Sequence, residues 1–184
     1  MTYAAAPPDL VLPDRDRSPP VSPRRQLDPQ TLDRHIDRLY RAARFMCFSR
    51  EEAEDLVQET FERVLAKPRI LRSEDDLGYL LRVLRNTWVS RRRAAARRPQ
   101  TVALPETSSL LEDRSAGKLD ARLERMALYD AVAALPDIFR EVLVAIDVAG
   151  LSYRQAADAL GVREATVTTR LHRARQRVAS QIAQ

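Results

Sequence analysis

Cysteine, glycine and aromatic residues are scarce in this chain of 184 residues. Its single cysteine, Cys47, excludes an internal disulfide and any zinc site built from several cysteines, and its place on an apolar helical stripe predicts a buried structural thiol. Four glycines and an aromatic content of 5% favour an all-α protein. No apolar run approaches the ~20 residues that a helix needs to span a bilayer, and residues 1–20 do not have the pattern of a secretory signal. We therefore expect a cytoplasmic protein without membrane insertion.

Positive charge is the property that this chain has in excess. The formal net charge is +5, the isoelectric point is near 9.9, and 31% of the residues are charged. The excess is carried by clustered arginines rather than by lysines, and a planar guanidinium suits phosphate contacts. The charge pattern indicates a nucleic-acid partner.

The first part of the chain predicts a tail followed by a helical bundle. Six of the eleven prolines lie within residues 1–27, which we expect to be a disordered tail. Residues 28–96 predict three amphipathic helices in one bundle, the first beginning at Asp28 and Pro29 and the next two capped by Ser49 with Glu52 and by Ser73 with Asp76. On the third helix the expected inward residues are Leu77, Leu80, Leu81, Leu84 and Trp88. For Trp88, core packing is favoured over stacking on a base.

The second part predicts a linker and a second bundle. Helical periodicity is lost over residues 97–118, which we interpret as a flexible linker, and it resumes over residues 119–184. An early helix carries Leu119, Leu123, Met126 and Val132, and a further helix with Ile138, Phe139, Val142, Leu143 and Ile146 closes at Gly150. The fold class predicted for the chain is therefore all-α, with two small helical bundles joined by a tether.

The segment Leu151–Val178 is the strongest functional signal in the sequence. Ser152 and Gln155 form a capping box pattern, and Gly161 stands where the C-terminus of a helix needs a left-handed residue. A second helix then buries Val167, Leu171, Ala174 and Val178. This pattern predicts a helix-turn-helix at the C-terminal end of the chain, with a second helix that could enter a DNA major groove.

The outer face of that second helix is cationic and polar. A simple helical hairpin with a solvated arginine face would share much of this pattern. Threonine and histidine, however, can reach base edges, and no acidic residue lies between Ala165 and Val178. These residues favour DNA binding.

The first bundle carries charges of opposite sign on two helices. Its second helix exposes an acidic face, which alone is most often a solvated surface, and its third helix carries arginines on its outer side. An acidic patch suits a protein partner, and a basic ridge suits a phosphate backbone.

Residues 51–68 (EEAEDLVQETFERVLAKP) and 79–93 (YLLRVLRNTWVSRRR) resemble the second domain of extracytoplasmic-function (ECF) sigma factors of the sigma-70 class. Residues 134–178, which end in RLHRARQRV, resemble the fourth domain of the same family. A helix-turn-helix alone is weakly specific, but the three motifs in this order are highly specific. The resemblance covers nearly all of the chain from residue 28 onward and implies an RNA polymerase sigma factor, which would direct initiation at chosen promoters.

The resemblance also implies roles for particular residues. In such families the acidic helix docks on the clamp helices of the largest subunit of core RNA polymerase, the third helix engages and helps to melt the −10 promoter element, and the C-terminal helix reads the −35 element. The expected polymerase contacts are Asp55, Gln58 and Glu59, with Leu56 and Phe61 as supporting packing. The expected −10 residues are Arg82, Arg85, Asn86, Arg91 and Arg92, with Asn86 a candidate for holding an unstacked base. The expected −35 readers are Thr168, Thr169, His172 and Arg173, with Arg163, Arg170 and Arg175 placed for phosphate.

Two positions depart from the family pattern. The recognition helix commonly begins with Gly-Thr, and here it has Ala165–Thr166, so the close approach to DNA can differ at that point. The position of Thr168 is often basic in the family, which leaves the base preference open. The linker lacks the middle domain of housekeeping sigma factors, as expected of the small ECF type.

No catalytic, cofactor or metal site is predicted, because the sequence shows no nucleophile–base pair, phosphate-binding glycine loop or metal-spaced cluster. The resemblance further implies an anti-sigma factor as a partner. Two other functions stay open at this point: an autonomous helix-turn-helix regulator, which has no need of the acidic Asp55–Glu59 face, and a nucleic-acid-processing enzyme, for which catalytic residues are missing.

Overall fold

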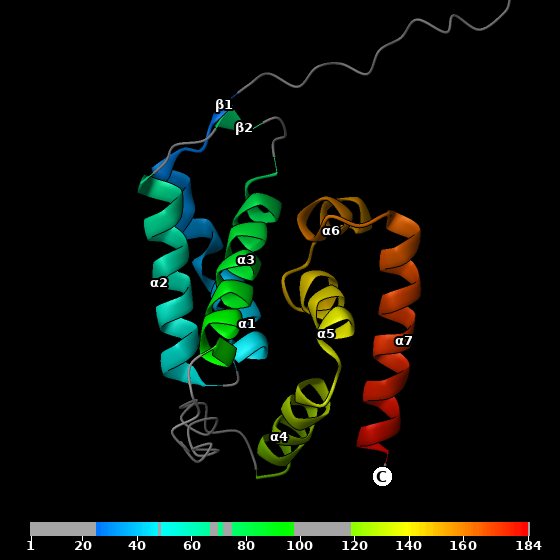
Figure 1. The fold of residues 1–184 in the computed structure, drawn as a ribbon. Coiled ribbons are helices and arrows are strands. Elements are labelled where there is room, and N and C mark those ends of the chain that lie inside the picture. Colours follow the sequence, from blue (N-terminus) through cyan, green and yellow to red (C-terminus); the bar gives the residue numbers. More distant parts are fainter. Residues whose placement is uncertain (1–24, 48, 67–69, 72–74, 98–118, 184) are drawn as a thin grey trace, which may run out of the picture.

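The computed structural model describes residues 25–47, 49–66, 70–71, 75–97 and 119–183, and these form two helical bundles that lie side by side (Figure 1). The all-α prediction is confirmed, with one small addition. Strand β1 (Arg25–Gln26) pairs antiparallel with strand β2 (Ile70–Leu71). Arg25 and Gln26, which belong to the predicted tail, are therefore in regular structure, because Ile70 and Leu71 provide their backbone partners. The rest of the predicted tail and residues 98–118 of the predicted linker lie outside the described residues.

The first bundle consists of a short 3-10 helix η1 (Pro29–His35) and helices α1 (Ile36–Cys47), α2 (Arg50–Ala66) and α3 (Asp76–Arg97). The predicted beginning at Asp28 is confirmed, since the Asp28 carboxylate accepts a hydrogen bond from the Gln30 N–H at 2.9 Å. The five inward residues predicted for α3 are at most 5% exposed. Trp88 is therefore a core residue, as favoured from the sequence.

The caps of α2 and α3 differ in detail from those predicted. Ser49 Oγ accepts a bond from the Glu52 N–H at 3.4 Å, but its hydroxyl donates to the Glu51 carboxylate at 2.9 Å. The Asp75 carboxylate caps α3 by accepting from the Gly78 N–H at 2.9 Å, whereas Ser73 lies outside the described residues. An aspartate two residues further along thus serves the role predicted for the serine.

The second bundle contains α4 (Leu119–Ala133), α5 (Asp137–Leu143), a π-helical turn η2 (Val144–Val148), α6 (Tyr153–Leu160) and α7 (Glu164–Ile182). Gly150 and Gly161 have φ values of +73° and +68°, so both predicted glycine stops adopt the left-handed conformation. The capping box of α6 is fully formed, at 3.3 Å and 2.8 Å between Ser152 and Gln155. The predicted helix-turn-helix is confirmed as α6–turn–α7.

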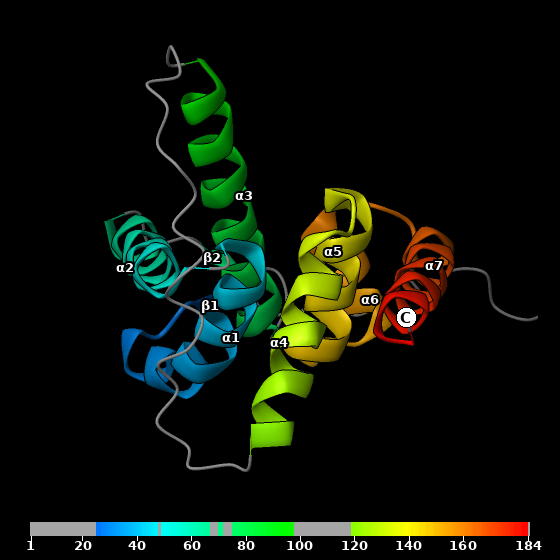
Figure 2. The same cartoon turned by 90° about the horizontal axis from the view of Figure 1, so that it is seen from below.

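Two residues predicted to face inward are about half exposed. Leu123 in α4 is 54% exposed and Ile138 in α5 is 49% exposed. Figure 2 shows the N-terminal end of α4, the helix that carries Leu123, extending beyond the other helices of its bundle. The predicted stripe of α7 is buried throughout, with Val178 the most exposed of its members at 9%.

A buried arginine joins α4 to α5. Arg140 is 8% exposed, and its guanidinium donates to the carbonyl oxygens of Val132 at 3.2 Å, Ala133 at 2.6 Å and Leu135 at 2.8 Å. The carbonyls of Val132 and Ala133 belong to the last turn of α4 and that of Leu135 to the turn that follows, where helix geometry leaves backbone acceptors short of partners. Arg140 therefore provides hydrogen-bond donors, from within the bundle, to the backbone carbonyls where α4 ends and the turn to α5 begins.

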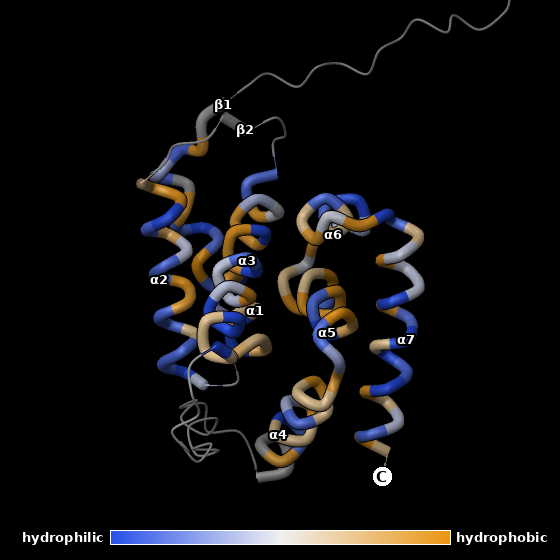
Figure 3. Tube along the Cα trace, in the orientation of Figure 1, coloured by the Kyte–Doolittle hydropathy of each residue, from blue (hydrophilic) through white to orange (hydrophobic). Residues whose placement is uncertain are grey.

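The bundles also touch each other. The rings of Phe45 in α1 and Tyr129 in α4 stack with centroids 4.4 Å apart, and the Arg44 guanidinium lies 5.9 Å from the Tyr129 ring. Figure 3 shows that α2 and α7, the outermost helices in that view, are largely hydrophilic with apolar residues at intervals. In the described part of the chain, no helix has the length and apolar content to cross a membrane.

Cys47 is half-buried at the end of α1, and its environment opposes ionisation. Burial, with a smaller effect from the Glu52 carboxylate, raises the pKa of its thiol to about 12. Because the thiolate is the reactive form, we expect a disulfide reagent at pH 8 to modify the folded chain at least about tenfold more slowly than the urea-unfolded chain. Absorbance of the released thiol measures both rates, and equal rates would show that the Cys47 thiol is not protected.

Candidate functional site

The acidic face of α2 is a surface formed by Asp55, Gln58 and Glu59. Asp55 and Gln58 are exposed, and Glu59 is half-buried. Leu56 is fully buried and Phe61 is partly buried against the core, so both pack within the bundle that carries this face. The Asp55 carboxylate forms no hydrogen bond or ion pair with any described residue, whereas the Gln58 amide donates to Glu62 at 3.0 Å. An unpartnered exposed carboxylate can meet a cationic group of another molecule without first giving up an internal contact.

Glu59 is bound by two arginines. One carboxylate oxygen lies 2.6 Å from Nη2 of Arg63 and the other lies 2.6 Å from Nε of Arg91. Arg91 also donates through Nη2 to the Asp55 carbonyl oxygen at 3.0 Å. Partial burial opposes ionisation of Glu59, but the hydrogen bonds and positive charges of Arg91 and Arg63 outweigh it and lower its pKa. Glu59 is therefore an ionised and oriented group at neutral pH.

Three of the four arginines of α3 that were predicted to contact DNA are engaged by the second bundle, and the fourth, Arg91, contacts α2. Arg85 forms an ion pair with Glu141 of α5 at 2.8 Å, and the Glu141 side chain is only 9% exposed. Arg82 donates to the Asp158 carbonyl oxygen in α6. Arg92 pairs with Asp137 at the start of α5 and lies over the Trp88 ring, 4.9 Å from its centroid. In this arrangement the basic side of α3 meets acidic groups of the same chain.

Asn86 differs from the arginines on either side of it. Its side chain is exposed and makes no hydrogen bond with any residue that the structure describes. A primary amide offers both donors and an acceptor, which suits the edge of an unpaired base. The prediction for Asn86 therefore stays a prediction, with an accessible side chain in its support.

The outer face of α7 brings together Thr168, Thr169, His172 and Arg173, all of which are exposed. The Thr168 and Thr169 hydroxyls donate to the carbonyl oxygens of Glu164 at 3.0 Å and Ala165 at 2.9 Å. Their oxygen atoms thus remain available as acceptors. His172 and Arg173 have no polar partner among the described residues. The face presents acceptors and donors in adjacent positions, as direct readout of base edges requires.

The three residues placed for phosphate differ in their surroundings. Arg163 is the exposed N-cap residue of α7, and Arg170 is half-buried on that helix. Arg175 is held by the Asp147 carboxylate of η2 through two bonds of 3.0 Å and 2.6 Å. A bidentate pair of this kind ties α7 to η2. Arg175 already has an anionic partner in this arrangement, so it would have to leave Asp147 to reach a phosphate, and the prediction for it stays a prediction.

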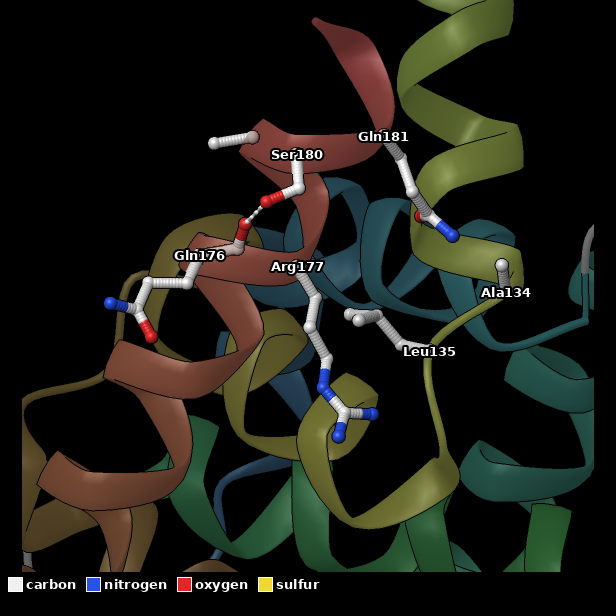
Figure 4. Close-up of a pocket in the computed structure, with 7 residues that line it drawn as sticks. Ala134, Leu135, Gln176, Arg177, Ser180 and Gln181 are labelled. Atoms are coloured by element: carbon white, nitrogen blue, oxygen red, sulfur yellow. Dashed lines mark hydrogen bonds between the residues drawn. The ribbon is translucent and has the colours of Figure 1, made fainter. Parts of the chain in front are cut away.

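An open hollow of about 780 Å³ lies between the end of α4 and the C-terminal part of α7 (Figure 4). Its lining includes Leu135, Gln176 and one charged side chain, Arg177, whose guanidinium lies 4.6 Å from the Phe139 ring centroid. Nothing in this lining pairs a nucleophile with a base. The predicted binding residues lie instead on α2, α3 and α7.

The sequence did not reveal the acidic partners of these arginines. Asp137, Glu141 and Asp147 pair with Arg92, Arg85 and Arg175, and the sequence pattern assigned these acids no role. The pairs join residues far apart in the chain, so no local spacing could identify them.

Comparison with known families gives two matches. Residues 31–98 match the family model described as Sigma-70 region 2, and residues 125–178 match that described as Sigma-70, region 4. The first match contains α2 and α3, and the second contains the helix-turn-helix. The predicted binding residues of α2 and α3 therefore fall within the first match, and those of α7 fall within the second.

Curated relatives match over most of the chain. The ECF RNA polymerase sigma factor SigE of Mycolicibacterium smegmatis is 36% identical over 160 residues, which is 84% of this chain and 61% of that protein. The ECF RNA polymerase sigma factor SigL of Mycobacterium tuberculosis is 33% identical over 142 residues, which is 76% of this chain and 80% of that protein. The chain thus spans less than two thirds of the length of SigE and about four fifths of the length of SigL.

Solved structures share the fold. The sigma factor RpoE from Bartonella quintana, in complex with the anti-sigma factor NepR, has a TM-score of 0.67 at 25% identity, covering 84% of this chain and 95% of that one. CnrH, in complex with the cytosolic domain of CnrY, has a TM-score of 0.58 at 23% identity, covering 84% and 86%. The arrangement of the helices is therefore one already known.

Proposed function

Because this chain belongs to the ECF family of sigma-70-class RNA polymerase sigma factors, we propose that it binds core RNA polymerase and directs promoter-specific initiation of transcription. The observation that carries the proposal is the presence, on one chain, of an acidic helix face, a basic helix and a helix-turn-helix with a free polar face. A polymerase contact and two DNA contacts are what a promoter-specificity subunit requires.

The acidic face of α2 is the proposed contact with the clamp helices of the largest polymerase subunit. Asp55 and Gln58 would make polar contacts, with Glu59 beside them and with Leu56 and Phe61 supporting the helix from below. The support for this assignment is the exposure of Asp55 and its lack of an internal partner. A complementary cationic patch on the partner would steer association and fix its register.

The basic helix α3 and the recognition helix α7 are the proposed promoter contacts. Arg82, Arg85 and Arg92 would meet the −10 region after leaving their partners in the second bundle, and Asn86 would hold a base that has left the stack. Thr168, Thr169, His172 and Arg173 would read the −35 element, with Arg163 and Arg170 on phosphates. The DNA would thus replace the contacts between the bundles that the structure shows.

Sigma factors are regulatory proteins, and we propose that this chain likewise supplies specificity without a reaction of its own. Its place of action would be with the polymerase and the chromosome, in the cytoplasm. We also propose an anti-sigma factor as a partner, since RpoE from Bartonella quintana, which shares the fold, is a sigma factor in complex with the anti-sigma factor NepR. Residues 28–97 would form the polymerase and −10 domain, and residues 119–184 the −35 domain.

Run-off transcription tests the proposed function directly. Purified core polymerase with this chain should produce specific transcripts from some members of a promoter library, and core polymerase alone should not. Binding of the chain to DNA in the absence of polymerase, with no specific transcript from any member, would indicate an autonomous regulator instead.

The free position of Arg173 predicts a specific effect on −35 recognition. Replacing Arg173 with alanine should weaken holoenzyme binding to its −35 element by about 1–2 kcal/mol and relax the preference at one or two base positions, because one base-edge contact is lost. Electrophoretic mobility shifts against a −35 library measure both effects.

The matched control is Arg175→Ala, in which an arginine of the same helix is lost. Because Asp147 holds Arg175, this change should lower thermal stability and leave the order of preferred sequences unaltered. Equal losses on all sequences for both variants would mean that Arg173 grips phosphate rather than reading bases.

A further inference from the structure

We infer that Arg91 is a positioning residue of the polymerase-docking face, which it orients through Glu59, rather than a DNA contact. The inference rests on the proposed function of α2, and it changes the role that the sequence pattern assigns to Arg91. Its basis is the set of contacts that Arg91 makes within the first bundle.

The Arg91 guanidinium bridges one turn of α2. Its Nε lies 2.6 Å from a carboxylate oxygen of Glu59, and its Nη2 donates to the Asp55 carbonyl oxygen at 3.0 Å. Residues 55 and 59 are one helical turn apart and lie on the same side of the helix. The planar, rigid fork of arginine can make both contacts at once, which the single ammonium of lysine cannot do in the same geometry. Arg91 therefore fixes the turn that carries the proposed polymerase contacts.

Arg63 also contacts Glu59 but cannot serve the same purpose. It lies on α2 itself, four residues after Glu59, and its side chain is 50% exposed. Pairs of this type on a helix surface contribute little to stability and constrain the helix only locally. Arg91 comes from α3, so it is the contact that sets the Glu59 carboxylate relative to the rest of the bundle.

The other arginines of α3 near Arg91 differ from it in their contacts. Arg92 turns toward Trp88 and Asp137, on the side of α3 that meets the second bundle. The Arg93 side chain is exposed and forms no ion pair or hydrogen bond with any described residue. Arg82 and Arg85 share the side of Arg92. Arg91 is thus the member of the basic helix that faces α2, and its Nε and Nη2 donate there.

A double-mutant cycle on core binding tests the inference. The full chain is labelled with a fluorophore and titrated with core polymerase for four proteins: wild type, Arg91→Ala, Glu59→Gln and the double variant. We expect Arg91→Ala to lower affinity for core about tenfold, and the double variant to bind no more weakly than the weaker single variant, because Arg91 acts through Glu59. Arg91→Lys should recover part of the loss, and Arg93→Ala should bind core like wild type.

Three results would overturn the inference. Unchanged core affinity for Arg91→Ala, with weaker binding of the reconstituted holoenzyme to −10 DNA, would make Arg91 a DNA contact. An equal loss of affinity in the wild-type and Glu59→Gln backgrounds would mean that Arg91 supports the fold in general. If Asp55→Arg and Glu59→Gln both leave core affinity unchanged, the docking face itself is wrong and the role of Arg91 falls with it.

Discussion

Replacing Asp55 with arginine is expected to lower the affinity of the chain for core RNA polymerase by about 100-fold. The Asp55 carboxylate is exposed and has no partner among the described residues, so the change removes an available anion and places a cation at the centre of the acidic face. Like charges brought together at an interface cost several kcal/mol, and each ~1.4 kcal/mol is a tenfold change in affinity. Titration of labelled chain with core polymerase measures the loss, and circular dichroism checks that the helices are intact.

Glu124→Arg is the matched control for this change. Glu124 is an exposed acid on α4, so the substitution alters the net charge by the same amount on a different surface. It should leave core affinity near that of wild type. The difference between the two variants should also shrink as salt is raised, because ions screen exposed charges. Equal affinities for both variants at low salt would remove α2 from the polymerase interface.

The second large effect concerns stability. Replacing Arg140 with alanine is expected to lower the free energy of unfolding by about 3 kcal/mol, because each buried acceptor left without a partner costs about 1–3 kcal/mol. Three carbonyl oxygens, those of Val132, Ala133 and Leu135, receive hydrogen bonds from this one side chain. That of Val132 also accepts a bond from the Leu135 N–H at 3.1 Å, so the expected loss comes mainly from Ala133 and Leu135. Water could reach only part of this site after the substitution, since Arg140 is 8% exposed. Urea unfolding followed by circular dichroism measures the change.

Two further variants define what Arg140 contributes. Arg140→Lys keeps the charge but cannot serve three acceptors in one plane, so it should lose more than half as much stability as the alanine variant. Arg154→Ala, at an exposed position of α6, should unfold like wild type. A loss for Arg140→Ala no greater than that for Arg154→Ala would show that the turn between α4 and α5 does not depend on this side chain.

The structural features that the sequence predicted correctly are those determined by residues close together in the chain. The Ser152 capping box, the glycine stops at Gly150 and Gly161, and the buried stripe of α7 each depend on spacings of a few residues, and all were found where expected. The apolar stripe of α3 follows from the same periodicity. Local geometry leaves few alternatives at such positions, so pattern reasoning is sufficient there.

The contacts that the sequence did not reveal join distant parts of the chain. The sequence predicted that arginines gather on α3. It did not predict which of them contact α2 and which contact the second bundle, because this depends on the side of α3 against which each of these elements packs. Arg91 and Arg92 are adjacent in sequence, yet one pairs with Glu59 and the other with Asp137. Likewise, the sequence pattern assigned Arg140 no role, because the path of the preceding turn is what makes it a buried donor.

The contacts of Arg82, Arg85 and Arg92 with the second bundle bear on how a basic protein finds its polymerase in a cell full of DNA. Each phosphate that a protein neutralises releases a counterion and adds about 0.9 to the slope with which the logarithm of non-specific affinity falls with the logarithm of salt concentration. If three arginines are kept from phosphates, that slope should be lower by about 2.7 and non-specific binding to chromosomal DNA should be weaker. Non-specific binding to the genome is a particular cost for a chain with an isoelectric point near 9.9. Under the proposed function, the Glu141 and Asp137 carboxylates and the Asp158 carbonyl oxygen would thus leave more of the unassembled protein available to polymerase.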